Sequence, residues 1–189
     1  YTDGAEVQNL TDVDGGKYHL YAQWTARNDT RYTVYKDLMN LNGEGYALDR
    51  QGTVYTGTSD AEITVTPTGI NGFDLPASQT ITIAADGSTE VRFQYVRQKR
   101  KLTLRDEEYI ETETPSDDYY YGTYITLVAK ERDGYTFVNW NGNSSLTNPT
   151  VQFNLHYNET YRPIYQANTY NIVFDKNATV ATGSMTPQQ

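Results

Sequence analysis

The chain has 189 residues, of which 24 are acidic and 15 are basic, so its net charge at pH 7 is −9. Nucleic acid is therefore excluded as a partner, because phosphate binding needs a basic stripe and the sequence has none. The absence of cysteine excludes disulfides, thiolate metal sites and a cysteine nucleophile. No apolar run approaches the roughly 20 residues that span a bilayer, so we expect no membrane insertion.

The composition indicates a mainly β protein, α+β at most, with little helix. Tyrosine dominates the aromatic residues, with 18 Tyr against 5 Phe and 2 Trp. Thr, Val and Ile recur between Gly, Asn and Asp, which is typical of short strands joined by turns. No stretch longer than about ten residues has an apolar period of 3.6. The polar run 106–114 is the best place for a short helix.

The first predicted strands are residues 32–41 and 45–56, which flank Asn42-Gly43. An Asn-Gly dipeptide between two alternating runs is a strong signal of a β-hairpin. Residues 62–66 alternate in the same way and end at a proline. This part of the chain is therefore expected to begin with a hairpin followed by a third strand.

A second hairpin is predicted a little later. Residues 80–84 and 90–95 alternate, and the turn sequence Ala-Asp-Gly-Ser lies between them at 85–88. Two aromatic residues of the second strand, Phe93 and Tyr95, are candidates for the core.

The densest apolar signal is the stretch Gly-Tyr-Thr-Phe-Val-Asn-Trp-Asn-Gly at 134–142. Alternation places Tyr135 and Phe137 on one face of a strand, and Trp140 falls where that strand must bend or bulge. Three large aromatics in so few residues are expected to form a module core. The strands predicted around it are 102–104, 124–128, 135–140, 151–155 and 160–165.

The sequence contains an internal repeat with a period of about 70 residues. Strands with similar patterning begin at three positions spaced by 69 residues: Tyr32, Lys101 and Tyr170. Modules end on an aromatic residue at three positions spaced by 71 and 70 residues: Trp24, Tyr95 and Tyr165. We therefore expect Trp24, like Tyr95, to belong to a module core.

The connections between the repeats are short and polar, which favours a semi-rigid string of small modules over one globule. The predicted division is the C-terminal part of an interrupted repeat at 1–26, complete modules at 31–98 and 99–167, and the N-terminal part of a further repeat at 168–189.

Several of these segments resemble repeats of bacterial surface proteins. The opening of the internalin B-type repeat, also called the Listeria–Bacteroides repeat, is similar to Tyr170-Asn-Ile-Val-Phe-Asp175 through Gly183-Ser-Met185. Its closing half is similar to 1–26, with Leu20-Tyr-Ala-Gln-Trp24. Module 99–167, with Gly134-Tyr-x-Phe-x-x-Trp140, resembles a divergent variant of this repeat. Module 31–98 resembles the related mucin-binding-type repeats.

The resemblance implies tandem β-grasp-like modules on the stalk of a Gram-positive, cell-wall-anchored surface protein, and it carries no catalytic residues and no cofactor. Segments 1–26 and 168–189 are opposite parts of an interrupted repeat and cannot complete their own sheets. Unpaired strand edges invite pairing with another chain. We therefore expect these ends to be poorly ordered or to pair between molecules.

The sequence offers little catalytic or metal-binding chemistry. The two histidines, His19 and His156, fall in predicted strands and lack the context of a catalytic base beside an exposed nucleophile. The acidic run 106–118 lacks the loop pattern of a calcium site and is interpreted as a solvated face. Asp12-x-Asp14-Gly15 has a fragment of such a pattern without the remaining ligands. We expect no catalytic, cofactor or metal site.

Three consecutive tyrosines, Tyr119, Tyr120 and Tyr121, are the candidate ligand contacts. Neighbouring strand residues face opposite sides, so at least one ring should point to solvent, where it could stack on a sugar or pack on a protein. The competing interpretation is that Tyr119 and Tyr121 complete the core and Tyr120 is a lone exposed ring.

The sequence thus supports a non-enzymatic hypothesis: an extracellular stalk or spacer region of a bacterial adhesin or other surface protein. The second hypothesis is a module that binds host glycoprotein or polysaccharide through exposed tyrosines.

Overall fold

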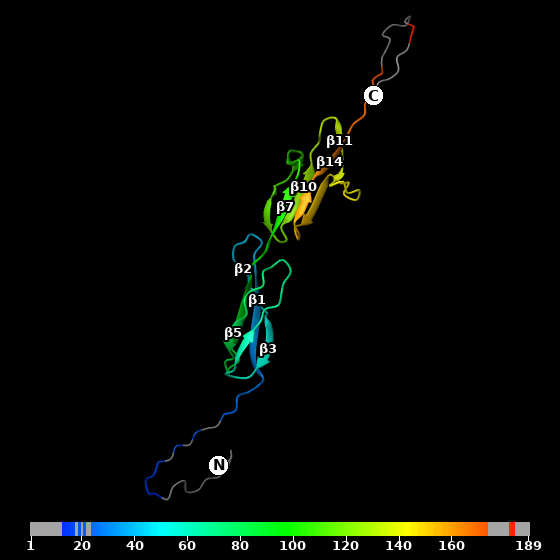
Figure 1. Cartoon of the computed structure of the whole chain (residues 1–189). Helices are drawn as coiled ribbons and strands as arrows, with labels where there is room; N and C mark the ends of the chain where they lie inside the picture. Colours follow the sequence, from blue (N-terminus) through cyan, green and yellow to red (C-terminus); the bar gives the residue numbers. More distant parts are fainter. Residues whose placement is uncertain (1–12, 18, 20, 22–23, 174–181, 184–189) are drawn as a thin grey trace.

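The computed structural model describes residues 13–17, 19, 21, 24–173 and 182–183 (Figure 1). Strands dominate this part of the chain, and its one helix is the 3-10 turn η1 (Glu107–Tyr109), inside the polar run where a short helix was expected. The mainly β fold class is confirmed. The strands are β1 (Thr30–Met39), β2 (Tyr46–Ala47), β3 (Thr53–Gly57), β4 (Glu62–Val65), β5 (Gln79–Thr82), β6 (Thr89–Tyr95), β7 (Lys99–Leu104), β8 (Ile110–Glu111), β9 (Asp117–Tyr120), β10 (Tyr124–Ala129), β11 (Tyr135–Trp140), β12 (Thr150–Asn154), β13 (Glu159–Tyr161) and β14 (Pro163–Ala167).

Strand β1 organises module 31–98. It pairs antiparallel with β2 and β3 on one side and parallel with β6 on the other. The predicted first hairpin is present, but its second strand, expected at 45–56, is divided into β2 and β3. The N–H of Asn40 donates to the carbonyl of Gly45 at 3.1 Å, and the N–H of Gly43 to that of Asn40 at 3.0 Å. Gly43 has φ 78°, a conformation that favours glycine.

The predicted second hairpin is wrong. Strand β5 pairs antiparallel with β4, whereas β6 leaves that pair and lies parallel to β1. The turn at 84–89 is real, with the Gly87 N–H donating to the Ala84 carbonyl at 3.0 Å. It passes the chain from one sheet to another, because alternation determines which face of a strand is buried and does not determine its partner.

Module 99–167 repeats the parallel arrangement. Strand β7 pairs antiparallel with β9 and parallel with β13, while β12, β10 and β8 form a second sheet and β11 pairs with β14. The parallel partners are 57 residues apart in both modules, as in Tyr32 with Thr89 and Leu102 with Glu159. The two modules therefore share the long connection that returns the chain beside its first strand.

Each module has its own buried core. Trp140 is the largest fully buried side chain and lies among Leu102, Ile125, Leu127 and Leu155. The register of β11 shifts between Phe137 and Asn139, which is the irregularity expected next to Trp140. The other core contains Val34, Val91, Phe93 and Tyr95.

Two residues expected in a module core lie outside both clusters. Trp24 is 91% exposed, and the described segment that carries it, 24–29, contains no strand. Tyr135 is 39% exposed, because it begins β11 at the end of the module, where the Arg132 guanidinium carbon lies 3.9 Å from its ring centroid. Phe137, two residues further along β11, is partly buried against the core of module 99–167.

The two modules lie end to end, with β1 to β6 in one and β7 to β14 in the other (Figure 1). Most of the two end segments, 1–26 and 168–189, lies outside the described residues, and so does their predicted pairing between molecules.

Candidate functional site

The three consecutive tyrosines lie at the end of the hairpin formed by β7 and β9, where module 99–167 meets module 31–98. Tyr119 turns into its own module: it packs against the core, and its hydroxyl donates to the Pro115 carbonyl at 2.8 Å. Burial, and to a lesser degree the nearby Asp117 and Glu107 carboxylates, raise the pKa of Tyr119. Tyr119 therefore supports the hairpin of its own module, and it also lines an open pocket with Leu41 and Asn42 of module 31–98.

Tyr120 and Tyr121 lie against two glycines of module 31–98. A Cβ added at Gly43 would overlap the Tyr120 ring, and one added at Gly72 would overlap the Tyr121 ring. Gly72 also has φ 81°, so the backbone there favours glycine for two independent reasons. The side chain of Asn71 donates to the Tyr121 hydroxyl at 3.3 Å. Glycines of one module thus form a flat surface for the aromatic rings of the next.

Arg97 ties the two modules together. Its Nε donates to the Met39 carbonyl at 3.1 Å and its Nη1 to the Tyr121 carbonyl at 2.9 Å. Its guanidinium carbon lies 4.6 Å from the centroid of the Phe73 ring, close enough for a cation–π contact. One side chain therefore satisfies main-chain groups of both modules.

The backbone makes the connection continuous. The Gln98 N–H donates to the Gly72 carbonyl at 2.9 Å, and the Tyr121 N–H donates to the Gln98 carbonyl at 2.8 Å. The residue that links the modules is hydrogen-bonded to both. We call the contact made by Gly43, Gly72, Arg97, Tyr120 and Tyr121 the joint.

The outer side of the joint is covered by cationic and aromatic side chains. His156 stacks on Tyr121 with ring centroids 4.7 Å apart, and the Arg100 guanidinium carbon lies 5.7 Å from the Tyr121 centroid. Lys99 Nζ lies 5.3 Å from the Tyr120 centroid. Tyr120 and Tyr121 are half-buried, with only part of each ring left for solvent.

Neither histidine lies in a strand, contrary to expectation. His156 is in the loop between β12 and β13, and His19 is in an irregular segment near Tyr21. The stacking of His156 on Tyr121 gives it a role in the joint. Sequence alternation could not have located it, because the loop that carries it is defined only by where β12 and β13 end.

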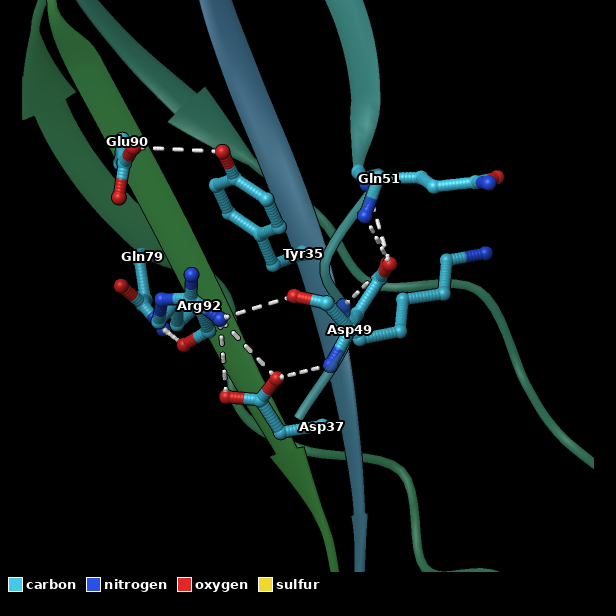
Figure 2. A network of polar contacts seen from close by, with 9 residues as sticks. Tyr35, Asp37, Asp49, Gln51, Gln79, Glu90 and Arg92 are labelled. Atoms are coloured by element: carbon cyan, nitrogen blue, oxygen red, sulfur yellow. Dashed lines mark hydrogen bonds and ion pairs between the residues drawn. The ribbon is translucent and has the colours of Figure 1, made fainter. Parts of the chain in front are cut away.

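Away from the joint, module 31–98 contains a charged network around a buried carboxylate (Figure 2). The Asp37 side chain is 2% exposed and accepts a hydrogen bond from the Asp49 N–H at 2.8 Å. Arg92 pairs with Asp37 at 3.1 Å, and its guanidinium carbon stacks 4.0 Å from the Tyr35 centroid. Asp37, Asp49 and Arg92 each bond to groups of the same module, so the network is interpreted as structural.

We expect Asp49 to give module 31–98 an acid-sensitive contribution to stability. Its carboxylate accepts backbone hydrogen bonds from Gly52, Gln51 and Lys36, which lower the pKa of Asp49 in the folded protein. A lowered folded-state pKa means that the stabilisation is complete above the ordinary aspartate pKa of about 4 and is lost as pH falls through the lowered value.

Urea denaturation should therefore show Asp49→Asn to be less stable than wild type at pH 7, with the difference shrinking at about pH 2. A difference that stays constant between these two pH values would show that the carboxylate charge is not what these hydrogen bonds stabilise.

The described residues contain no group of three or more His, Cys, Asp or Glu side chains placed to hold a metal ion. Within the acidic run, Asp106 pairs with Arg162 at 2.5 Å, and Glu107 accepts from the Ser116 N–H at 3.2 Å. Asp117 and Asp118 are exposed. Asp12 lies outside the described residues. No helix of the described part of the chain is long and apolar enough to cross a membrane.

The sequence singled out Tyr120 and Tyr121 as ligand contacts and not as a contact between modules, and it missed Gly43, Gly72 and Arg97. Asn42-Gly43 and Asn71-Gly72 were readable as turns. The second role of the two glycines, as surfaces on which tyrosine rings lie, depends on the neighbouring module. No local sequence pattern indicates it.

Comparison with known proteins supports the resemblance over one module. No curated protein and no solved structure matches the chain. The family described as the divergent InlB B-repeat domain matches residues 107–169, which covers β8 to β14 and the residues that follow. This segment is therefore similar to a repeat domain of the InlB type, a family associated with bacterial surface proteins.

Proposed function

We propose that the chain is a non-enzymatic spacer region in the stalk of an extracellular, cell-wall-anchored surface protein or adhesin of a Gram-positive bacterium. Modules 31–98 and 99–167 are two complete units of this stalk, and segments 1–26 and 168–189 belong to further repeats. The InlB-type match of residues 107–169 supports a surface location. The absence of a catalytic role is part of the proposal.

The observation that carries the proposal is the joint. A spacer must keep its length, and the short connection 96–98 between β6 and β7 favours a fixed orientation of the modules but does not by itself impose one. Here glycine–tyrosine contacts, Arg97 and two backbone hydrogen bonds fix the modules end to end (Figure 1). The net charge of −9 keeps neighbouring stalks soluble and apart.

The joint predicts that both modules tumble as one body. Residual dipolar couplings of the full chain should fit one alignment tensor for residues 31–167. Tyr121→Ala removes the ring from Gly72 and the stack with His156, so we expect the modules of this variant to report tensors of different magnitude. Tyr124→Ala, which removes a 55% exposed ring of the same module, is the matched control and should change nothing. Different tensors in the wild-type chain would contradict the spacer.

The competing function is binding of host glycoprotein or polysaccharide through Tyr119, Tyr120 and Tyr121. The exposed parts of the Tyr120 and Tyr121 rings favour it, since aromatic faces stack on sugars and protein partners. Binding of the full chain to mucin or a glycan array, repeated with Tyr120→Ala, separates the two. Binding that disappears with the substitution while the single tensor is retained favours the ligand-binding module over the spacer.

A further inference from the structure

The end of module 99–167 opposite the joint repeats the backbone of the surface that receives Tyr121. Gly134 has φ 77°, close to the 81° of Gly72. The Asn168 N–H donates to the Gly134 carbonyl at 2.8 Å, as the Gln98 N–H donates to the Gly72 carbonyl at 2.9 Å. In both modules, a residue just after the last strand donates its N–H to the carbonyl of such a glycine.

The aromatic residue after each glycine also pairs antiparallel with the end of its module and carries a guanidinium group over its ring. Phe73 bridges antiparallel to Arg97, and Tyr135 pairs antiparallel with Ala167. Each ring is covered by a guanidinium group, from Arg97 at 4.6 Å and from Arg132 at 3.9 Å. The two ends thus share a glycine and an aromatic residue in equivalent positions. A guanidinium group covers the ring in both, although Arg97 lies across from Phe73 and Arg132 lies two residues before Gly134.

The two glycines differ in what covers them. The Tyr121 ring lies on Gly72, whereas Gly134 is exposed and no described atom lies within 4 Å of a Cβ built there. An open groove of about 730 Å³ surrounds it, lined among others by Arg132, Tyr135 and Tyr165. The contact that closes the joint on module 31–98 is therefore unfilled on module 99–167.

We propose that Asp133, Gly134 and Tyr135 form a docking surface for an aromatic ring of the β module that follows residue 168 in the polypeptide. This inference rests on the proposed spacer function and names the contact by which the spacer continues. The joint indicates the occupant. After Gln98, the chain enters a module whose Tyr121 lies on Gly72. If the chain continues after Asn168 in the same way, the next module places a ring on Gly134.

The side chain that precedes the glycine indicates which kind of aromatic residue docks there. Asn71 donates to the hydroxyl of Tyr121 at 3.3 Å in the joint, and the exposed Asp133 holds the equivalent place before Gly134. A carboxylate can only accept a hydrogen bond, so it suits the O–H of a tyrosine as donor. A tyrosine should therefore dock better than a phenylalanine.

The test extends the chain at the point where the next module would begin. Residues 1–168 are continued by a second copy of residues 99–189, so that the added Tyr121 can reach Gly134. The ring current of a stacked tyrosine moves the Hα resonances of the glycine beneath it upfield, and Gly72 in the unmodified chain is the internal standard. We expect Gly134 to gain an upfield shift in the extended chain and to lose it when the added copy carries Tyr121→Leu, but not Tyr124→Leu.

The other outcomes would overturn either the docking surface or the joint. An extended chain in which Gly72 is shifted and Gly134 is not would overturn the docking surface and leave the spacer intact. A Gly72 without the shift in the unmodified chain would overturn the joint itself. A shift of Gly134 that appears in the unmodified chain with rising concentration would show that a second molecule occupies the surface and would overturn the proposal. An added copy that does not fold also counts against it, because the equivalent position after Gln98 supports folding.

Discussion

Trp140→Ala is expected to unfold module 99–167 or bring it close to unfolding, while module 31–98 stays folded. Trp140 is fully buried, its ring meets Phe137 and Tyr161 edge-on at 5.7 and 5.9 Å, and its Nε1 donates to the Asn148 carbonyl at 3.1 Å. Truncating a buried tryptophan costs about 3–5 kcal/mol. A small domain is stable by only about 5–15 kcal/mol, so most of the stability of this module is at stake.

Calorimetry of the full chain checks this result, with amide spectra assigning each transition to a module. We expect the transition of module 99–167 to move to a much lower temperature and the amides of β1 and β6 to keep their folded shifts. Loss of both modules in one cooperative transition would show that the joint makes them a single folding unit.

Arg92→Leu should give the second large effect, this time in module 31–98. It removes the partner of the buried Asp37 carboxylate and the group stacked on Tyr35. Leaving one charge of a buried pair without its partner costs about 3–5 kcal/mol. The Arg92 side chain is 42% exposed, so solvent screening reduces the expected loss to about 2–3 kcal/mol.

Urea denaturation followed by the amide resonances of β1 and β6 measures this loss. The control is Arg27→Leu, which removes an ion pair whose two side chains, Arg27 and Asp29, are 71% and 67% exposed. It should leave the midpoint unchanged. Adding Asp37→Asn to Arg92→Leu should recover part of the lost stability, because the unpaired charge is then gone. A double variant less stable than Arg92→Leu alone would rule out the charge as the cause.

The sequence predicted the features that depend on residues close together along the chain, such as strand positions and turns. Alternation located β10, β11 and β12, and Asn42-Gly43 located the first turn. The apolar spacing around Trp140 even indicated the irregularity of β11. These features follow from φ/ψ preferences and from which face of a strand is apolar.

The sequence could not predict which strands pair. Residues 80–84 and 90–95 have every local mark of a hairpin, yet β6 lies beside β1, its partner residues 57 positions away. The choice depends on the free energy of the whole module, since burying Phe93 and Tyr95 against Val34 requires β6 to cross over. The joint is non-local in the same way, because Gly72 and Tyr121 belong to different modules.

The parallel pairs β1 with β6 and β7 with β13 also determine how each module responds to a pull along the chain. Tension enters module 31–98 at the start of β1 and leaves at the end of β6, so the two adjacent strands are drawn in opposite directions along their length. Their hydrogen bonds are loaded in shear and must break together, instead of opening one at a time as in a zipper. The rate of forced unfolding, more than the equilibrium stability, would then decide how long such a module survives under flow.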